Sequence, residues 1–394
     1  MRMEIDGDRA EIEAWMILLR APGIGAAALR SLIERHRGAT RALHAARRGE
    51  VPGVDAACRA WLQAPESARI ALDLEWLAAK DHRLLRFGDP DFPALLRDTP
   101  GAPAALFVAG DVTALWRAQV AIVGSRSASH AGIANARSFA RALVASGFAI
   151  TSGLAEGIDG AAHDAALGAG GVTLAVLGTG PDLVYPAKHQ DLAARIAQHG
   201  ALVSEFPPGT PGRPENFPRR NRIIAGLALG TLVVEAGLRS GSLITARCAS
   251  EQGRDVFAIP GSIHHPLARG CHQLIRQGAA LVESAEEIVV GLAPLALRLG
   301  AHLRERLIGE CDPEAAALAR ETDSAPTPGH SKLLEAMGHD ALGIDSLAER
   351  TGLAIPVLSS MLLELELEGE VALERGGAYV RRNRPDVMEA DPAS

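Results

Sequence analysis

The chain has 394 residues, 47% of them hydrophobic and 22% charged, with a formal net charge of −7 at pH 7. This is an ordinary globular composition, and at about 100–200 residues per domain its length predicts two to four domains. The acidic balance excludes a protein that holds nucleic acid through its overall charge, so any such partner would need a local basic groove.

Residues 1–82 are predicted to form a helical domain of the SAM or helix-hairpin-helix type. Apolar residues from Trp15 to Leu19 precede the turn Pro22-Gly23-Ile24-Gly25, and Leu29 and Leu32 then recur at helical spacing. In the DNA-binding form of this motif, free N–H groups of the turn hold a phosphate. We favour the alternative, a turn that only packs two helices, because the nearby arginines lie on a mixed surface.

Residues 83–290 are predicted to form one doubly wound, Rossmann-like α/β domain. From about residue 105, short apolar runs alternate with Gly-rich turns and Ala-rich helical stretches. Buried β-branched runs that alternate with helices indicate a parallel sheet covered on both faces. The predicted strands are Leu106–Val108, Val120–Val123, Phe148–Ile150, Thr173–Leu177, Leu202–Val203, Thr231–Val234 and Val256–Ile259.

The last part of the chain is predicted to be a linker followed by a winged helix. Residues 291–328 are rich in Ala, Arg, Pro and Thr, which indicates a linker with room for one helix in its first part. Residues 329–385 contain three apolar helix patterns and then two short strands around Arg375-Gly376-Gly377, a hairpin signal. Three helices and a β-wing make a winged helix.

The third helix of this module carries Glu364, Glu366 and Glu368 and no Lys or Arg. A recognition helix that lies in a DNA groove should not carry this charge. We therefore favour a protein partner for the winged helix, and we expect residues 386–394 to be a disordered tail.

Glycine turns follow the predicted strands, at the sheet edge where doubly wound folds bind their ligands. In Gly124-Ser125-Arg126, small residues let a phosphate approach N–H groups at a helix start, and the arginine adds a cation. The turn is neither a P-loop nor a complete GxGxxG, so it predicts no ATP or dinucleotide cofactor. In the next turn, Thr151–Gly160, we interpret Asp159 as a helix N-cap.

Two later stretches combine aromatic and basic residues. After the strand 173–177 come Tyr185, Lys188 and His189. The ring can stack on a base and the ammonium can pair with a phosphate, although a tyrosine packed against the core is an equal alternative. In the stretch Asn216-Phe217-Pro218-Arg219-Arg220-Asn221-Arg222, three arginines form the densest basic patch of the chain. An arginine guanidinium can bind a phosphate through two hydrogen bonds, and a phenylalanine ring can stack on a base. We therefore favour a DNA-binding role for this stretch over the alternative, a solvated run of charges that caps a helix.

The turn after the strand 231–234 contains Arg239, Ser240, Gly241 and Ser242, which form an anion-accepting nest at a helix start. Five such turns at the strand ends of one sheet are more specific than any one of them. Together they predict a phosphate-binding edge.

The sequence predicts no metal site and no catalytic residue. His264, His265 and His272 lack metal-ligand spacing. Neither a nucleophile elbow nor an HExxH motif occurs, and Glu235 and Asp159 are catalytic candidates only because they lie near turns.

Cellular location is predicted from the cysteines and the N-terminal residues. Cys58, Cys248, Cys271 and Cys311 are scattered without CxxC spacing, which fits a reducing cytosol. The first residues, MRMEIDGDRAEIEAW, lack the apolar core of a signal peptide, and no run of about 18 apolar residues occurs. We expect a cytoplasmic protein without a membrane span.

Read in order, these stretches resemble the DNA-processing protein A family (DprA, also Smf). The matching segments are AIVGSRSAS, SGLAEGIDGAAH, LAVLGTGPDLVYPAKH, LVSEFPPGT, NFPRRNRIIAG, VVEAGLRSGSLITA, EQGRDVFAIPGS and RGCHQLIRQGA, across roughly residues 85–290. The resemblance implies a Rossmann-like domain that binds single-stranded DNA without sequence preference. It also implies a homodimer that loads the RecA recombinase onto incoming strands in natural transformation.

The resemblance also implies which residues bind DNA. They are Gly124, Ser125, Arg126, Tyr185, Lys188, His189, Asn216, Phe217, Arg219, Arg220, Asn221, Arg222, Arg239, Ser240, Gly241 and Ser242. Glu156 is acidic where many members carry Arg, so no DNA role is assigned to it.

We expect a DNA-binding protein rather than an enzyme. The alternative is a nucleotide-processing, phosphoribohydrolase-like enzyme, which the fold and the turn Glu235–Gly241 suggest, but its PGGxGTxxE signature is absent. A transcriptional regulator led by the winged helix is a third reading, which the acidic third helix argues against.

Overall fold

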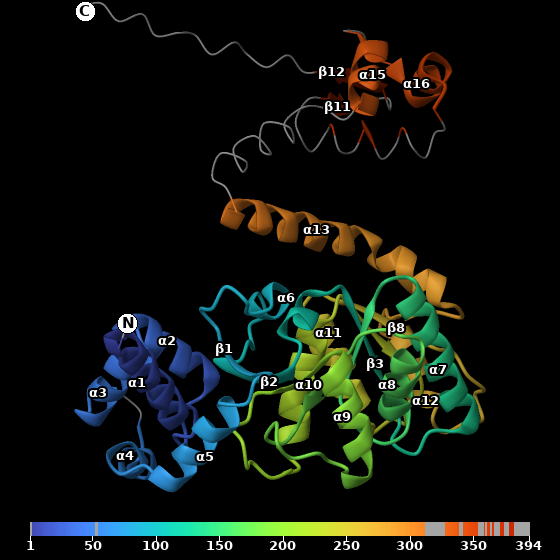
Figure 1. Ribbon diagram of the computed structural model, residues 1–394. Helices are drawn as coiled ribbons and strands as arrows, with labels where there is room; N and C mark the ends of the chain where they lie inside the picture. Colours follow the sequence, from blue (N-terminus) through green and yellow to red (C-terminus); the bar gives the residue numbers. More distant parts are fainter. Residues whose placement is uncertain are drawn as a thin grey trace, which may run out of the picture. The chain divides into compact units, whose positions relative to one another are not determined.

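The computed structural model describes residues 2–51, 54–311, 328–338 and 342–353, and then 358, 361–362, 365, 371–373 and 378–381. The chain divides into two compact units, residues 1–300 and 301–394. Figure 1 shows the elements of each unit.

The first unit begins with five helices. They are α1 (Arg2–Leu19), α2 (Ala26–His36), α3 (Ala39–Arg47), α4 (Ala56–Gln63) and α5 (Ser67–Leu77). Gly23 lies in the turn between α1 and α2 with φ +80°, a value that glycine adopts without strain. Trp15, Leu18 and Leu29 are buried in one core that also takes in Phe107 from the sheet. The helices therefore pack directly against the α/β part of the unit.

One buried ion pair fastens these helices to a loop of the α/β part. Arg20 Nε and Nη2 donate to the carboxylate of Asp73 on α5 at 2.6 and 2.5 Å, and Nη2 also donates to the Pro208 carbonyl at 2.6 Å. The Asp73 side chain is fully buried, and burial raises the pKa of its carboxyl against the lowering effect of Arg20. Arg30 is also turned inward, over the Phe87 ring.

A nine-stranded sheet forms the centre of the unit, in the order β1-β2-β6-β5-β4-β3-β7-β8-β9. Its strands are β1 (His82–Arg86), β2 (Ala105–Gly110), β3 (Gln119–Val123), β4 (Ala149–Ser152), β5 (Thr173–Leu177), β6 (Ala201–Ser204), β7 (Gly230–Val233), β8 (Asp255–Ala258) and β9 (Ala280–Leu281). The seven strands from β6 to β9 in this order are parallel, while β2 is antiparallel to both β1 and β6. The predicted α/β fold with a mostly parallel sheet is confirmed.

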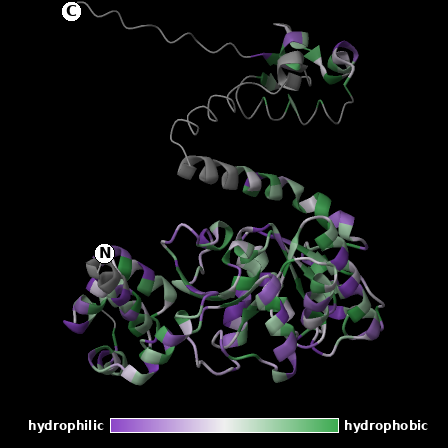
Figure 2. Cartoon of the chain, viewed as in Figure 1, coloured by the Kyte–Doolittle hydropathy of each residue, from purple (hydrophilic) through white to green (hydrophobic). Residues whose placement is uncertain are grey.

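Helices cover both faces of the sheet. They are α6 (Ala94–Arg97), α7 (His130–Ala145), α8 (Ile158–Gly168), α9 (Gln190–His199), α10 (Asn216–Leu227), α11 (Ser242–Glu251) and α12 (Arg269–Arg276), with short 3₁₀ turns η1 (Val112–Trp116) and η2 (Ala187–His189). Helix α13 (Ala285–Cys311) follows β9, and Ile288 and Leu292 in its first part are buried. Helix α8 packs between α7 and α9, and α10 packs on α11 and α6. Figure 2 shows hydrophobic and hydrophilic residues alternating along these helices, as expected for elements with one buried face.

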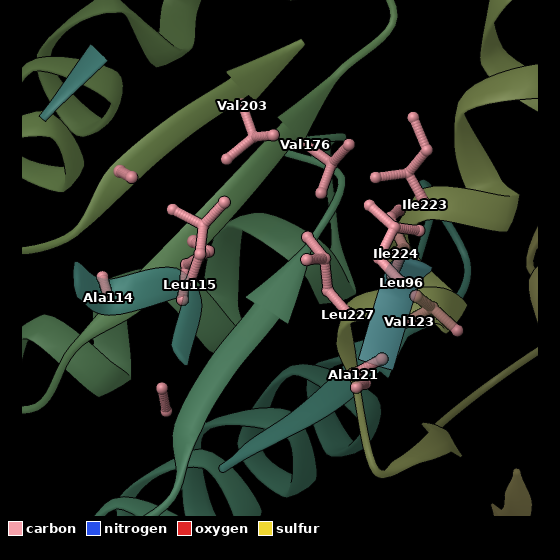
Figure 3. Packing of buried hydrophobic residues seen from close by; sticks show 14 of the residues in the cluster. Leu96, Ala114, Leu115, Ala121, Val123, Val176, Val203, Ile223, Ile224 and Leu227 are labelled. Carbon is pink, nitrogen blue, oxygen red and sulfur yellow. The ribbon is translucent and has the colours of Figure 1, made fainter. Parts of the chain in front are cut away.

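Strand β5 shows how the two faces are built. Val176 packs in a cluster with Ile223 of α10, and Figure 3 shows these side chains with Val203 and Leu227. The next residue, Leu177, belongs to a different cluster, with Ile196 of α9. Alternate residues of a strand point to opposite faces, so α9 and α10 cover opposite sides of the sheet.

A histidine is buried in α8. The Thr173 hydroxyl donates to the Ile150 carbonyl at 2.7 Å, so it accepts a hydrogen bond from His163 Nδ1, also at 2.7 Å. The neutral ring therefore carries its proton on Nδ1, and Nε2 is left without a hydrogen-bond partner among the described residues. Burial lowers the pKa of His163 to about 3.

The second unit contains α15 (Pro328–Met337), β10 (Leu342–Gly343), α16 (Ile344–Thr351), β11 (Val371–Leu373) and β12 (Ala378–Arg381). The strands form an antiparallel sheet in the order β10-β12-β11. Leu358, Leu362 and Leu365, from the predicted third helix, lie in one core with Leu333 and Leu347. The acidic positions Glu364, Glu366 and Glu368, the turn 375–377 and the tail 386–394 lie outside the described residues.

Candidate functional site

The strand order reverses next to β3. Strands β4, β5 and β6 follow on one side of it, and β7, β8 and β9 follow on the other. Loops at such a switch point diverge to opposite faces of the sheet and leave a crevice at the carboxyl ends of the strands. Here the loops are Gly124–Ser129 after β3 and Val234–Gly241 after β7.

Glu235 joins these two loops. Its carbonyl accepts from the Ser125 N–H at 2.7 Å, and its carboxylate accepts from the Ser129 N–H at 2.9 Å and the Ser129 hydroxyl at 2.5 Å. The Ser129 hydroxyl oxygen also caps α7 by accepting from the Gly132 N–H at 3.0 Å. This carboxylate, a catalytic candidate in the sequence, is thus engaged in holding the loops.

A cleft of about 910 Å³ opens between the loops, and we call it the basic cleft. Its charged lining consists of four arginines, Arg126, Arg220, Arg239 and Arg269, and one carboxylate, Asp159. Arg126, Arg239 and Arg269 are exposed, and among the described residues none of the three forms an ion pair. An acidic chain therefore concentrates free positive charge in one concave site, where it attracts anions most strongly.

Two aromatic rings lie beside these cations. The rings of Tyr185 and Phe217 are 5.4 Å apart between centroids, and the Arg126 guanidinium lies 5.6 Å from the centre of the Phe217 ring. Tyr185 is 54% exposed. A side chain at Gly178 would place its Cβ 2.7 Å from the Phe217 ring, so the ring sits where it does because residue 178 is glycine.

A smaller pocket of about 260 Å³ shares this aromatic wall, and we call it the aromatic pocket. It is lined by Arg126, Gly153, Ala155, Glu156, Tyr185, Pro186, Phe217 and Arg220. Phosphates and bases of one strand could thus be held by adjacent but chemically different surfaces.

Arg220 forms the floor between the basic cleft and the aromatic pocket. It is only 4% exposed, and its Nη1 donates to the carbonyls of Gly153, at 2.7 Å, and Val176. Burial lowers the pKa of Arg220 to about 10, which keeps the guanidinium charged at neutral pH, while burial raises the pKa of nearby Asp159. Arg220 thus anchors α10 to two strand ends.

The other two arginines of the basic patch, Arg219 and Arg222, pair with Glu205 outside the cleft. Arg219 Nε lies 3.2 Å from one oxygen of Glu205, Arg222 Nη2 lies 2.5 Å from the other, and neither arginine lines the cleft or the aromatic pocket. Arg222 also donates to the Gly101 carbonyl. The three neighbouring arginines therefore do not form one row.

Lys188, His189 and Asn216 line neither the cleft nor the pocket, whereas the other remaining predicted residues line the cleft: Gly124, Ser125, Asn221, Ser240, Gly241 and Ser242. Asn221 Nδ2 donates to the Gly241 carbonyl at 3.2 Å and supports the Arg239–Ser242 loop, in which the Ser240 and Ser242 hydroxyls are 2.7 Å apart. His189 Nδ1 donates to the Leu154 carbonyl at 2.9 Å. Asn216 is buried at the start of α10, outside both the cleft and the pocket.

Comparison with known proteins gives the family. A family model described as DNA recombination-mediator protein A matches residues 83–293, more than half of the chain. The chain belongs to the DprA family. A second model, the DprA winged helix domain, matches residues 314–377. This match confirms a winged helix at this end of the chain; it overlaps the predicted range 329–385 and begins within the segment predicted to be a linker.

Two relatives and one solved structure illustrate the DprA match. Protein Smf of Escherichia coli (strain K12) is 46% identical over 80% of this chain and 81% of its own length. The putative DNA processing protein DprA of Mycobacterium tuberculosis (strain ATCC 25618 / H37Rv) is 36% identical over 90% and 91%, respectively. The solved DNA processing protein A of Streptococcus pneumoniae is 36% identical, with a TM-score of 0.64 over 71% of this chain and 97% of that one.

Two residues of the candidate site were given no role from the sequence: Arg269 was not considered, and Glu156 was considered but left without a role. Arg269 lines the basic cleft from the start of α12. Its position in the segment that follows the predicted strand Val256–Ile259 could have indicated this, because the other site residues also follow strand ends. Glu156 lines the aromatic pocket, where its Oε1 lies 2.9 Å from Lys188 Nζ. No local pattern could have paired Glu156 with Lys188, because the two residues lie in different turns.

The described residues of this DprA chain offer neither a metal site nor a membrane-spanning helix. No group of three or more His, Cys, Asp or Glu side chains is arranged to hold a metal ion there. None of the helices described is long and apolar enough to cross a membrane.

Proposed function

We propose that this DprA-family protein binds single-stranded DNA in the basic cleft, through its phosphates and without reading a sequence. The observation that carries the proposal is the set of exposed, unpaired arginines Arg126, Arg239 and Arg269 in one cleft of an acidic chain. Such cations release counterions when they bind phosphates, which gives sequence-independent affinity. The adjoining rings of Tyr185 and Phe217 favour a single strand, because bases in a duplex are already stacked and cannot reach them.

Binding is favoured over catalysis by the bonding of the two carboxylates near the cleft. Glu235 holds Ser129. The prediction of Asp159 as a helix N-cap is wrong: Gly157 is the N-cap of α8, and Asp159 lies in the first turn, where its carboxylate accepts from the N–H groups of Gly153 and Ala155 at 3.1 and 3.4 Å. Both have structural roles that account for their positions. We therefore do not propose the phosphoribohydrolase-like activity.

The biological setting follows from the family resemblance. We propose that the protein acts in the cytoplasm as a homodimer and loads the RecA recombinase onto single strands during natural transformation. The names of relatives described as DNA processing proteins support a role in DNA processing.

The test is a titration of the full chain with labelled single-stranded and duplex oligonucleotides, followed by fluorescence anisotropy between about 50 and 200 mM salt. If three arginines each neutralise one phosphate, the slope of log K against log salt is about −2 for a single strand. Arg126→Ala and Arg239→Ala should each make that slope shallower by about 0.7.

The matched control is Arg195→Ala, which removes an exposed arginine that pairs with Asp164 away from the cleft. It should leave the slope unchanged. Equal affinity for single strand and duplex, or an unchanged slope in the Arg126→Ala and Arg239→Ala variants, would refute the proposal.

A further inference from the structure

Glu156 is a carboxylate at the edge of the aromatic pocket, in the turn that follows β4. It pairs with Lys188 at 2.9 Å, and both side chains are about half exposed, 46% for Glu156 and 59% for Lys188. The hydrogen bond from Lys188 holds the pKa of Glu156 below its usual value, with smaller contributions from His189 and Arg126. The carboxylate is therefore negative at neutral pH.

This charge makes the aromatic pocket less suitable for phosphate than the basic cleft. The pocket shares Arg126 with the cleft, but a phosphate there would also meet the carboxylate of Glu156, with which Lys188 is already paired. Arg220 lines both sites, so its charge does not favour one over the other. The cleft adds the exposed arginines Arg239 and Arg269 to Arg126, so phosphates are expected there instead.

A nucleobase suits the same pocket. The rings of Phe217 and Tyr185 supply flat apolar surface, and the volume of about 260 Å³ leaves room for one base. A carboxylate has lone pairs for several donors, so Glu156 can keep Lys188 and still accept a hydrogen bond from a base.

We propose that the aromatic pocket is a nucleobase site in which Glu156 favours bases that present an amino group over thymine. A glutamate accepts well from the exocyclic amino group of cytosine, and the amino groups of adenine and guanine are donors of the same kind. Thymine has the O4 carbonyl in place of the amino group, and its one donor on this edge, N3–H, lies between two carbonyl oxygens that the carboxylate repels. The inference rests on the proposed function and narrows its sequence independence: the phosphates supply most of the affinity, whatever the sequence, and the aromatic pocket adds a preference by base composition.

The test compares homopolymers of deoxycytidine, deoxyuridine and thymidine, each of about 15 nucleotides, by anisotropy at one salt concentration. Deoxyuridine lacks the thymine methyl group, so it differs from deoxycytidine only in the exchange of the 4-amino group and the N3 acceptor for a 4-carbonyl and an N3–H donor. For the unaltered protein we expect oligo-dC to bind roughly threefold to tenfold more tightly than either oligo-dU or oligo-dT, as a hydrogen bond to a half-exposed charge allows.

Two variants decide the role of Glu156. Glu156→Ala removes the acceptor, so the three oligomers should bind with affinities within about twofold of one another. The matched control, Asp164→Ala, removes a carboxylate from another half-exposed ion pair, with Arg195 at 2.7 Å, and should keep the preference for oligo-dC. Both changes are on the surface, and circular dichroism confirms that each variant is folded.

The possible results separate the inference from the proposed function. Binding of all three oligomers with the same affinity by the unaltered protein, or a preference that survives Glu156→Ala, overturns the inference and leaves the proposed function standing. Failure of the unaltered protein to bind any single strand overturns both.

Discussion

Replacing Phe217 with leucine is expected to weaken single-strand binding without changing its salt dependence. Leucine keeps apolar volume beside Gly178 but removes the flat ring that adjoins Tyr185 and Arg126. Loss of one base–aromatic stack costs about 1–3 kcal/mol, which corresponds to roughly 5- to 150-fold in Kd. Tyr185 remains as a second ring, so we expect the lower part of this range, about tenfold.

The assay is anisotropy of a labelled single strand at several salt concentrations. The Phe217→Leu line of log K against log salt should run parallel to that of the unaltered protein and about one unit below it, because no charge is removed. The control is Phe87→Leu. The Phe87 ring lies outside the cleft and also has an arginine over it, Arg30, so this variant reports any general effect of losing a phenylalanine. Unaltered affinity in Phe217→Leu would show that no base stacks there, and a changed slope would show that the ring acts by placing Arg126.

Three further changes test the surroundings of the site. Gly178→Ala should weaken single-strand binding as Phe217→Leu does, because its Cβ would come within 2.7 Å of the ring, and the same titration measures this. Asp73→Ala should lower the free energy of unfolding by about 3 kcal/mol in urea titrations, since it removes both oxygens that accept from Arg20 and leaves that guanidinium without its buried partner; a loss below about 0.5 kcal/mol would contradict this. His163 takes up a proton at pH 6.5 when unfolded but only at about pH 3 when folded, so its contribution is complete above pH 6.5 and falls by about 1.4 kcal/mol per pH unit below it. The stability of His163→Asn relative to the unaltered protein should therefore rise at about that rate from pH 6.5 to about pH 4, and a constant difference would refute the buried neutral state.

The sheet could be predicted from the sequence because each buried strand is a continuous apolar run followed by a glycine turn, as in Val120–Gly124. Strand β1 was not predicted, because it carries a histidine and two arginines and only Leu85 is buried. Its place in the sheet comes from pairing with β2, a contact between segments that the local pattern does not contain.

The positions of individual site residues were less predictable. The turns after β3 and β7 could be grouped from the sequence, because parallel strands bring their carboxyl ends to one edge. The directions of Arg219, Arg220 and Arg222 could not, because on a helix successive residues turn by about 100° and the face that meets the sheet is set by tertiary packing. That rotation turns Arg220 into the floor of the cleft and leaves Arg219 and Arg222 to hold Glu205.

The bond between Ser129 and Glu235 has an evolutionary consequence. These residues are 106 positions apart in the chain, yet each satisfies the other's hydrogen-bonding groups at the start of α7. Losing the serine alone would remove a donor from the carboxylate, and losing the glutamate alone would leave an N–H group of the helix start without its acceptor. Among homologous sequences, residues 129 and 235 should covary: both should be kept, or both should be substituted together.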